Sequence, residues 1–196
     1  MKKILIGIFA VALAIPAMAQ KGGVTIGGSF DALMKKDYTA VAITPEIGYK
    51  VLDNLAVGLD LGFGSINDKT SGLKDQTSMF GVGVFGRYSF PLADKVSFAL
   101  KASVGYSSLT SKNDGQKSLG SPMNTIGIEV APELWFNLTK TTSLWLSVGS
   151  IGYFNTKPKD GDSQSAFNLS WNSSPLLDYG VEDAFSGPSF GVAFAF

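Results

Sequence analysis

The sequence contains no cysteine and no histidine. The absence of cysteine excludes disulfide bonds and thiolate metal sites as sources of stability. The absence of histidine removes the side chain that enzymes use most often to transfer protons and to bind transition metals. We therefore predict no cofactor, no metal site and no catalytic residues, and we do not expect the chain to be an enzyme.

Charge is also scarce. Asp, Glu, Lys and Arg make up 16% of the residues, compared with roughly 25% in an ordinary soluble domain. Basic and acidic residues balance at a net charge of zero, so nothing attracts the chain to nucleic acid. The 45% of hydrophobic residues and the 23 glycines favour a protein that exposes much of its surface to lipid rather than to water.

Long hydrophobic runs are missing except at the start of the chain. The pair Lys2-Lys3 precedes an apolar run over residues 4–15, and Ala17-Met18-Ala19 follows it. This order is typical of a secretory signal peptide with its cleavage site. A permanent membrane anchor is the alternative, but the run is shorter than the roughly 20 residues that span a bilayer. We predict a signal peptide over residues 1–19 and a mature chain from Gln20.

The mature chain alternates between apolar and small or polar residues with a period of two. The cleanest run is Leu55 to Phe63, in which leucine, valine and phenylalanine alternate with Ala56, Gly58, Asp60 and Gly62. Such alternation predicts β-strands with two different faces. The runs predict about eight strands, with ten possible. The expected fold is all-β: a closed antiparallel up-and-down transmembrane β-barrel over residues 20–196.

The connections between the predicted strands alternate in length. Short turns are expected at 52–54, 91–94 and 139–141, and longer polar connections at 65–76, 108–121 and 156–187. Outer-membrane barrels have short turns in the periplasm and long loops outside the cell. This pattern predicts that both termini are periplasmic and that 156–187 is a long extracellular loop.

Alternation alone does not say which face is the interior, since a soluble barrel would turn its apolar face inward. The charged residues on the predicted strands share one face, which is otherwise mostly glycine, alanine and serine. An eight-stranded barrel has little room inside, and the water-facing surface of a soluble barrel should carry more charge. The charged face is therefore predicted to be the interior. Its charged residues are Glu46, Lys50, Asp60, Arg87, Lys101, Glu129 and Glu133.

These interior charges are predicted to form a salt-bridge network. Four acids face three bases, and buried charges persist only when they are paired or hydrogen-bonded. A catalytic carboxylate pair is the alternative. Phe85, Trp135, Trp145 and Tyr153 are also expected to point inward, and Phe154 outward.

Two prolines interrupt predicted strands. Pro45 and Pro132 are each followed by a glutamate. Because proline cannot donate a hydrogen bond to a strand ladder, we predict a bulge or a bend at both positions.

Several segments resemble a known family. The run Pro45 to Tyr49, the run Asn54 to Gly58, the run Gly86 to Pro91 and the terminal Phe196 resemble the small bacterial outer-membrane β-barrels called porin-like or OmpX/OmpA-like, which are frequent in Bacteroidetes. The resemblance covers nearly all of the mature chain. It implies a closed small barrel in the outer membrane of a Gram-negative bacterium, in contact with outer-membrane lipids. It also implies an insertion signal, read by the outer-membrane insertion machinery, at Phe190, Val192, Phe194 and Phe196.

The function follows less directly from the sequence. One hypothesis is a structural or surface-interaction role, with a protein or glycan as partner of the extracellular loops. The alternative is a narrow passive diffusion pore for small solutes or ions. The long last loop is rich in apolar groups, which form either a surface contact site or a cap over the barrel mouth. The candidate contact residues are Phe167, Leu169, Trp171, Leu176, Leu177 and Tyr179.

Overall fold

The computed structural model describes residues 23–69, 75–114, 116–118, 121–170 and 189–196. The predicted signal peptide lies outside these residues, as do four of the predicted loop contacts: Trp171, Leu176, Leu177 and Tyr179. Within the described residues, no helix is long and apolar enough to cross a membrane.

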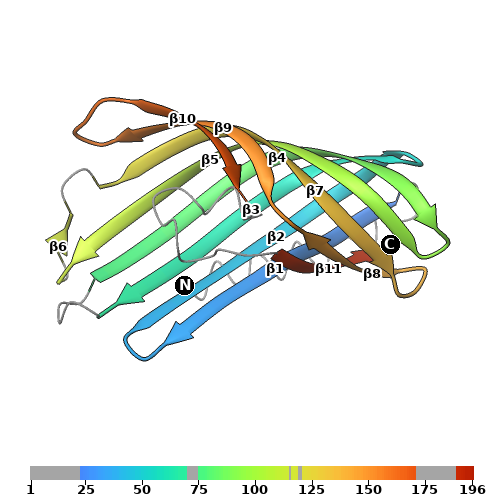
Figure 1. Ribbon diagram of the computed structural model, residues 1–196, viewed down its shortest axis with the longest axis horizontal. Coiled ribbons are helices and arrows are strands. Elements are labelled where there is room, and N and C mark those ends of the chain that lie inside the picture. The colour runs from blue at the N-terminus through green and yellow to red at the C-terminus, as the bar shows by residue number, and fades with distance from the viewer. Residues whose placement is uncertain (1–22, 70–74, 115, 119–120, 171–188) are drawn as a thin grey trace.

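The described residues fold into a single twisted sheet of antiparallel strands (Figure 1). Its strands are β1 (Val24–Lys35), β2 (Tyr38–Leu52), β3 (Leu55–Asp68), β4 (Asp75–Ala93), β5 (Val96–Asn113), β6 (Gln116–Lys117), β7 (Met123–Asn137), β8 (Thr142–Ser147), β9 (Ser150–Pro158), β10 (Gln164–Ser170) and β11 (Ser189–Ala195).

The sheet closes into an eight-stranded barrel, as the sequence predicted. Strands β1 to β5 follow one another in space, β7 pairs with β5, and β11 pairs with both β8 and β1 to complete the wall. Strands β8 and β9 both pair with β7 and form the two halves of one wall strand. The short β6 and the strand β10, which pairs with β9, are additional to these eight.

The short turns lie where they were predicted. Asp53–Asn54 and Asp94–Lys95 are two-residue turns, and residues 138–141 form the third connection. The last strand ends at the same end of the barrel, because the Ala195 amide donates to the Thr141 carbonyl (2.8 Å). Figure 1 shows these turns gathered at the end that carries the C-terminus.

At the opposite end the strands are longer than the sequence predicted. Strand β3 continues to Asp68 and β5 to Asn113, inside segments that were expected to be loops. β10 lies within the predicted loop 156–187, where the alternation of Phe167 and Leu169 with Asn168 and Ser170 predicts a strand extension. For β3 and β5 the prediction erred because serine, threonine and asparagine were taken as loop residues. Their polarity indicates contact with water, which is compatible with pairing in a sheet.

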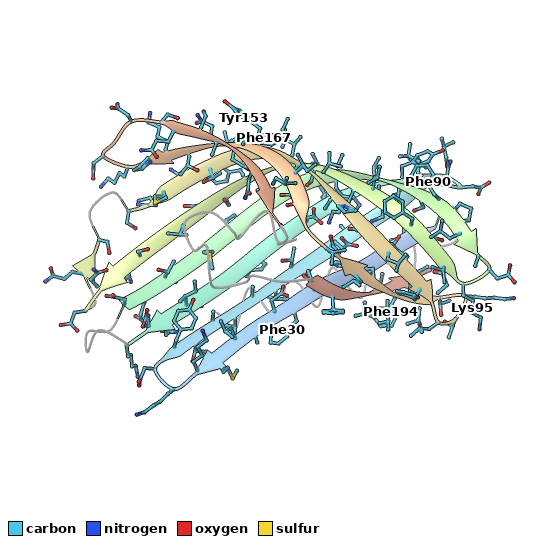
Figure 2. The ribbon with its side chains drawn as sticks, viewed as in Figure 1. Phe30, Phe90, Lys95, Tyr153, Phe167 and Phe194 are labelled. Carbon is cyan, nitrogen blue, oxygen red and sulfur yellow. The ribbon has the colours of Figure 1, made fainter. Side chains whose placement is uncertain are left out.

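The two faces of the wall have the predicted orientation. Leu59 is 50% exposed on the outside, whereas its neighbour Asp60 is 3% exposed inside. Figure 2 shows Phe30, Phe90, Phe167 and Phe194 projecting away from the barrel. The large side chains on the outside form the lipid-facing surface of the barrel.

A bulge between β8 and β9 reverses one predicted assignment. Glu133 pairs with Ser147 and Val130 with Ile151, so the two residues of β7 between them face three residues on the other strand. Gly149, in this bulge, has a φ of 78°, a conformation that glycine adopts without strain. The extra residue turns Phe154 inward and Tyr153 outward, so the prediction for this pair was wrong.

The bulge lies opposite Pro132, where one was predicted. Pro132 has no amide hydrogen to donate, and its carbonyl accepts a hydrogen bond from the Ser147 hydroxyl (2.9 Å). Pro45 behaves differently. It stays in continuous register with β1, and pairing with β3 resumes after it in the same register. No bulge forms there. At this point only Thr44 and Pro45 leave the ladder between β2 and β3, and the register is the same on both sides of them.

Beyond the aromatic side chains Phe63 and Phe80, the apolar residues of β3 and β4 point inward and the polar residues point outward. Phe63 and Phe80 lie on the outer face with their ring centroids 5.6 Å apart. We call the part of β1 to β5 beyond them, towards the loops, the loop-side section. There Ile66 points inward and is 4% exposed, while Asn67 on the outer face accepts a hydrogen bond from Gln76 (2.9 Å). On β3 and β4 the loop-side section therefore has the pattern of a barrel surrounded by water.

Candidate functional site

The interior of the barrel holds a layer of charge at the level of the membrane-spanning strands. Five neighbouring strands, β2, β3, β4, β5 and β7, each contribute one charged side chain to it. We call this group the charge layer. Its members are Glu46, Asp60, Arg87, Lys101 and Glu133.

Arg87 is the centre of the charge layer. Its Nη2 atom lies 2.9 Å from Glu46 Oε2, and its Nε atom lies 2.7 Å from Glu133 Oε2. The Arg87 side chain is 5% exposed, and the two glutamates are 4% and 2% exposed. Lys101 extends the layer, with its Nζ atom 3.0 Å from both Glu46 Oε2 and Asp60 Oδ1. The ion pairs therefore connect strands β2, β3, β4, β5 and β7 across the lumen.

Aromatic rings complete the surroundings of both cations. The Arg87 guanidinium lies 4.8 Å from the Phe85 ring centroid and 4.6 Å from that of Trp135. The Lys101 ammonium lies 4.5 Å from the Phe85 ring. Trp135 also donates its indole N–H to Glu133 Oε2 (2.8 Å). Cation–π contacts of this kind are strongest when water is excluded, and here they occupy the cross-section beside the ion pairs.

Two of the seven predicted charges lie outside the charge layer. The Lys50 side chain is 50% exposed and approaches only Asp53, at 3.8 Å, among the ion pairs of the described residues. Lys50 is close to the end of β2, where the lumen opens, so water solvates it. Glu129 is 4% exposed and lines a small cavity together with Asp60.

Two open spaces can be described inside the barrel. The cavity beside Asp60 and Glu129 has a volume of about 20 Å³, which is room for about one water molecule. A larger vestibule of about 270 Å³ opens at the turn end, and Lys50, Arg87 and Trp135 line it. The charge layer lies between these two spaces.

A second, apolar group of side chains lies inside the loop-side section, on strands β1 to β5. Ala40, Ala42, Ile66 and Met79 are its buried members, and Leu33, Tyr38 and Leu109 pack against them. We call these residues the apolar cluster. This cluster was not predicted, because Ile66 and Leu109 lie in segments 65–76 and 108–121, which were assigned to loops. One signal could have revealed it. After Phe63 the sequence still alternates, but the polar residues Ser65 and Asn67 take the outward positions and Ile66 takes an inward one.

Aromatic side chains fill the lumen where glycines leave space. A Cβ atom on Gly127 would lie 2.0 Å from the Phe154 ring, and one on Gly58 would lie 2.4 Å from the Phe85 ring. The glycines on the inner face are therefore spaces for large neighbours, as the sequence suggested. Only glycine fits at these positions without moving a ring.

The carboxylates of the charge layer are engaged by cations. Glu46 accepts from both Arg87 and Lys101, and Glu133 from Arg87 and Trp135. Such a layer ties strands together. In the described part of the chain, no group of three acidic, histidine or cysteine side chains is placed to hold a metal ion.

The two described members of the predicted loop contact site lie on the outer face. Phe167 is 71% exposed and pairs with Tyr153, and Leu169 is 74% exposed and pairs with Ile151. Figure 2 shows Tyr153 and Phe167 side by side. These two side chains therefore extend the lipid-facing surface onto β10. The predicted insertion residues likewise share the outer face of β11 and its end: Phe190, Val192, Phe194 and Phe196.

Comparison with known proteins gives one family and several structures. Residues 5–172 match the family model described as outer membrane protein beta-barrel domain. No curated protein matches the chain. A major outer membrane protein from Thermus thermophilus is 14% identical, with a TM-score of 0.52 over 90% of this chain and 100% of that one. At this identity the similarity is one of fold.

Two further structures are similar over most of their length. Neisserial surface protein A is 14% identical, with a TM-score of 0.47 over 89% of this chain and 97% of that one. The N-terminal β-barrel domain of Pseudomonas aeruginosa OprF is 13% identical, with a TM-score of 0.45 over 90% of this chain and 100% of that one.

Proposed function

Because the chain belongs to the outer membrane protein beta-barrel domain family, and so resides in the outer membrane of a Gram-negative bacterium, we propose that it is a non-enzymatic barrel that acts at the cell surface. In this role the barrel is a closed support, and the extracellular loops contact a protein or a glycan.

The filled interior is the observation that carries this proposal. The charge layer and the apolar cluster lie at successive levels along the strands, and the cavity beside Asp60 holds only about 20 Å³. An ion that passed the charge layer would then meet the apolar cluster, whose described members are all hydrocarbon or thioether side chains apart from Tyr38, and hydrophobic constrictions exclude water. Opening the charge layer alone should therefore not open a pore.

A narrow passive diffusion pore is the second candidate. The vestibule of about 270 Å³ favours it, because water can enter the turn end as far as Arg87 and Trp135. Against it, eight strands enclose an interior just wide enough for side chains to fill, whereas aqueous channels use about sixteen.

Conductance measurements separate the two candidates. We expect the purified barrel in planar bilayers to give at most small, intermittent currents, and liposomes that contain it not to swell in sugar solutions. A variant with Glu46→Gln, which weakens the charge layer, is expected to remain closed to sugars. Steady sugar uptake by the unmodified barrel would overturn the closed-barrel proposal and favour the pore.

Binding measurements test the surface role. Residues 172–187 contain three of the predicted contact residues, and a variant that lacks them retains β10 and β11. We expect it to lose binding to host-cell or glycan surfaces, while a control with serines at residues 70–73 binds normally. Unchanged binding together with altered barrel stability would favour the cap over the contact site.

The proposed route to the membrane includes export, cleavage and insertion. We propose that residues 1–19 are removed and that the insertion machinery reads the outward apolar residues of β11. Mass spectrometry of the outer-membrane fraction should find a mature chain that starts at Gln20. A full-length species in the inner membrane would contradict cleavage.

A further inference from the structure

Each described turn at the C-terminal end of the barrel carries an exposed leucine. Leu52 is 61% exposed, Leu92 is 64% exposed and Leu138 is 54% exposed. A single exposed leucine is ordinary and needs no explanation. Its recurrence at the β2–β3, β4–β5 and β7–β8 connections indicates a common role at this rim.

The leucines prolong the lipid-facing surface. Leu92 lies two positions after Phe90, at a register shift between Pro91 and Ala93. Leu138 lies two positions after Phe136, directly beyond the end of β7. Phe90 and Phe136 are themselves exposed on the outer face. At the third turn, a register shift between Lys50 and Leu52 places Leu52 at the end of β2.

Polar groups follow each leucine towards the tip of its turn. The tips are Asp53-Asn54, Asp94-Lys95 and Thr139-Lys140. Figure 2 shows Phe90 and Lys95 at this end of the barrel. The order along each strand is therefore aromatic ring, leucine, then polar tip. This order matches the change from acyl chains through the interface to water.

We propose that Leu52, Leu92 and Leu138 form a docking surface for the inner leaflet of the outer membrane. The leucines enter the boundary between headgroups and acyl chains and fix the depth of the barrel. The occupant is lipid rather than a periplasmic protein, because this surface is continuous with the lipid-facing wall. The inference depends on the outer-membrane location and is independent of what the extracellular loops bind.

The absence of native cysteine makes site-specific labelling direct. Nitroxide labels at Leu92→Cys and Leu138→Cys are compared with a label at Lys95→Cys, with the barrel refolded in phosphatidylethanolamine–phosphatidylglycerol vesicles. We expect collisions with oxygen, relative to a water-soluble nickel complex, to be several-fold more frequent at the leucine positions. Water-like ratios at both leucines would overturn the proposal. Protection from both reagents would also overturn it, in favour of a protein contact.

A second measurement tests whether the leucines fix depth. The reporter is a nitroxide at Val57→Cys, on the outer face of β3 and 43% exposed. Replacing the three leucines by serine should shift the depth reported at Val57. The matched control replaces Asn54, Lys95 and Lys140 by serine and should leave it unchanged. Folding of each variant is checked by circular dichroism. An unchanged depth in the folded leucine variant would overturn the anchoring role.

Discussion

On the two sides of the aromatic side chains Phe63 and Phe80, strand β3 carries opposite patterns of polar and apolar residues. In the spanning part of β3, Leu59 faces outward and Asp60 inward; in its loop-side section, Ile66 faces inward and Asn67 outward. The strand continues without a break between the two parts. Alternation is therefore a property of the strand, whereas the surrounding solvent decides which face is apolar.

The two interiors also depend on different physics. In the charge layer, stability depends on pairing, because a buried charge without its partner is strongly unfavourable. In the apolar cluster, stability depends on volume and close packing. Substitutions that change pairing should therefore have larger effects in the first region than substitutions that change one methyl group in the second.

Removal of Arg87 should have the largest effect. Arg87→Met leaves Glu46 and Glu133 in the lumen without their guanidinium, and breaking a buried pair in this way costs about 3–5 kcal/mol. Urea titration of the barrel in lipid vesicles measures the change in the free energy of unfolding. The control Lys50→Met, at a pair that is largely exposed, should be indistinguishable from the unmodified chain. Equal stability of both variants would refute the central role of Arg87.

A charge on the outer face should distinguish the two sections directly. Leu59→Arg places a charge in lipid and should cost about 2–4 kcal/mol. Ser78→Arg, on the exposed outer face of the loop-side section, should fold as well as the unmodified chain, because water surrounds it. Folding yields in vesicles measure both. Similar losses in the two variants would mean that lipid also surrounds the loop-side section.

An added methyl group tests how tightly the lumen is filled. Gly127→Ala puts a Cβ atom against the Phe154 ring, and such overpacking typically costs about 1–3 kcal/mol. Gly86→Ala is the matched control, since nothing lies within 4 Å of the added atom. The same urea titration compares them. If Gly127→Ala were neutral, Phe154 would not pack over this glycine.

The smallest effect is expected in the apolar cluster. Ile66→Val removes one buried methylene and should lower the free energy of unfolding by about 0.5–1.5 kcal/mol. Ile128→Val, at a side chain that is 55% exposed to lipid, should change it less. A larger loss at Ile128 than at Ile66 would contradict the burial of the cluster.

Much of the fold could be predicted from the period of two. The strands, the three short turns and the inward position of Arg87 all follow from local alternation and composition. The partners of Arg87 could not be predicted, because they depend on the stagger between strands. The inward turn of Phe154 depends on a bulge that forms opposite Pro132, on another strand. Ile66 was missed because it lies in residues 65–76, whose polar composition was taken as that of a loop.

The closure of the wall at β1 and β11 has a consequence for the order of folding. Thr25 pairs with Ala195, whereas β1 to β5 pair as successive hairpins. Pairs that are distant in sequence form late, because the entropy of closing the intervening chain must be overcome first. The hairpins should therefore assemble as an open, curved sheet with two free edges. Only the last seven-residue strand converts this sheet into a closed surface.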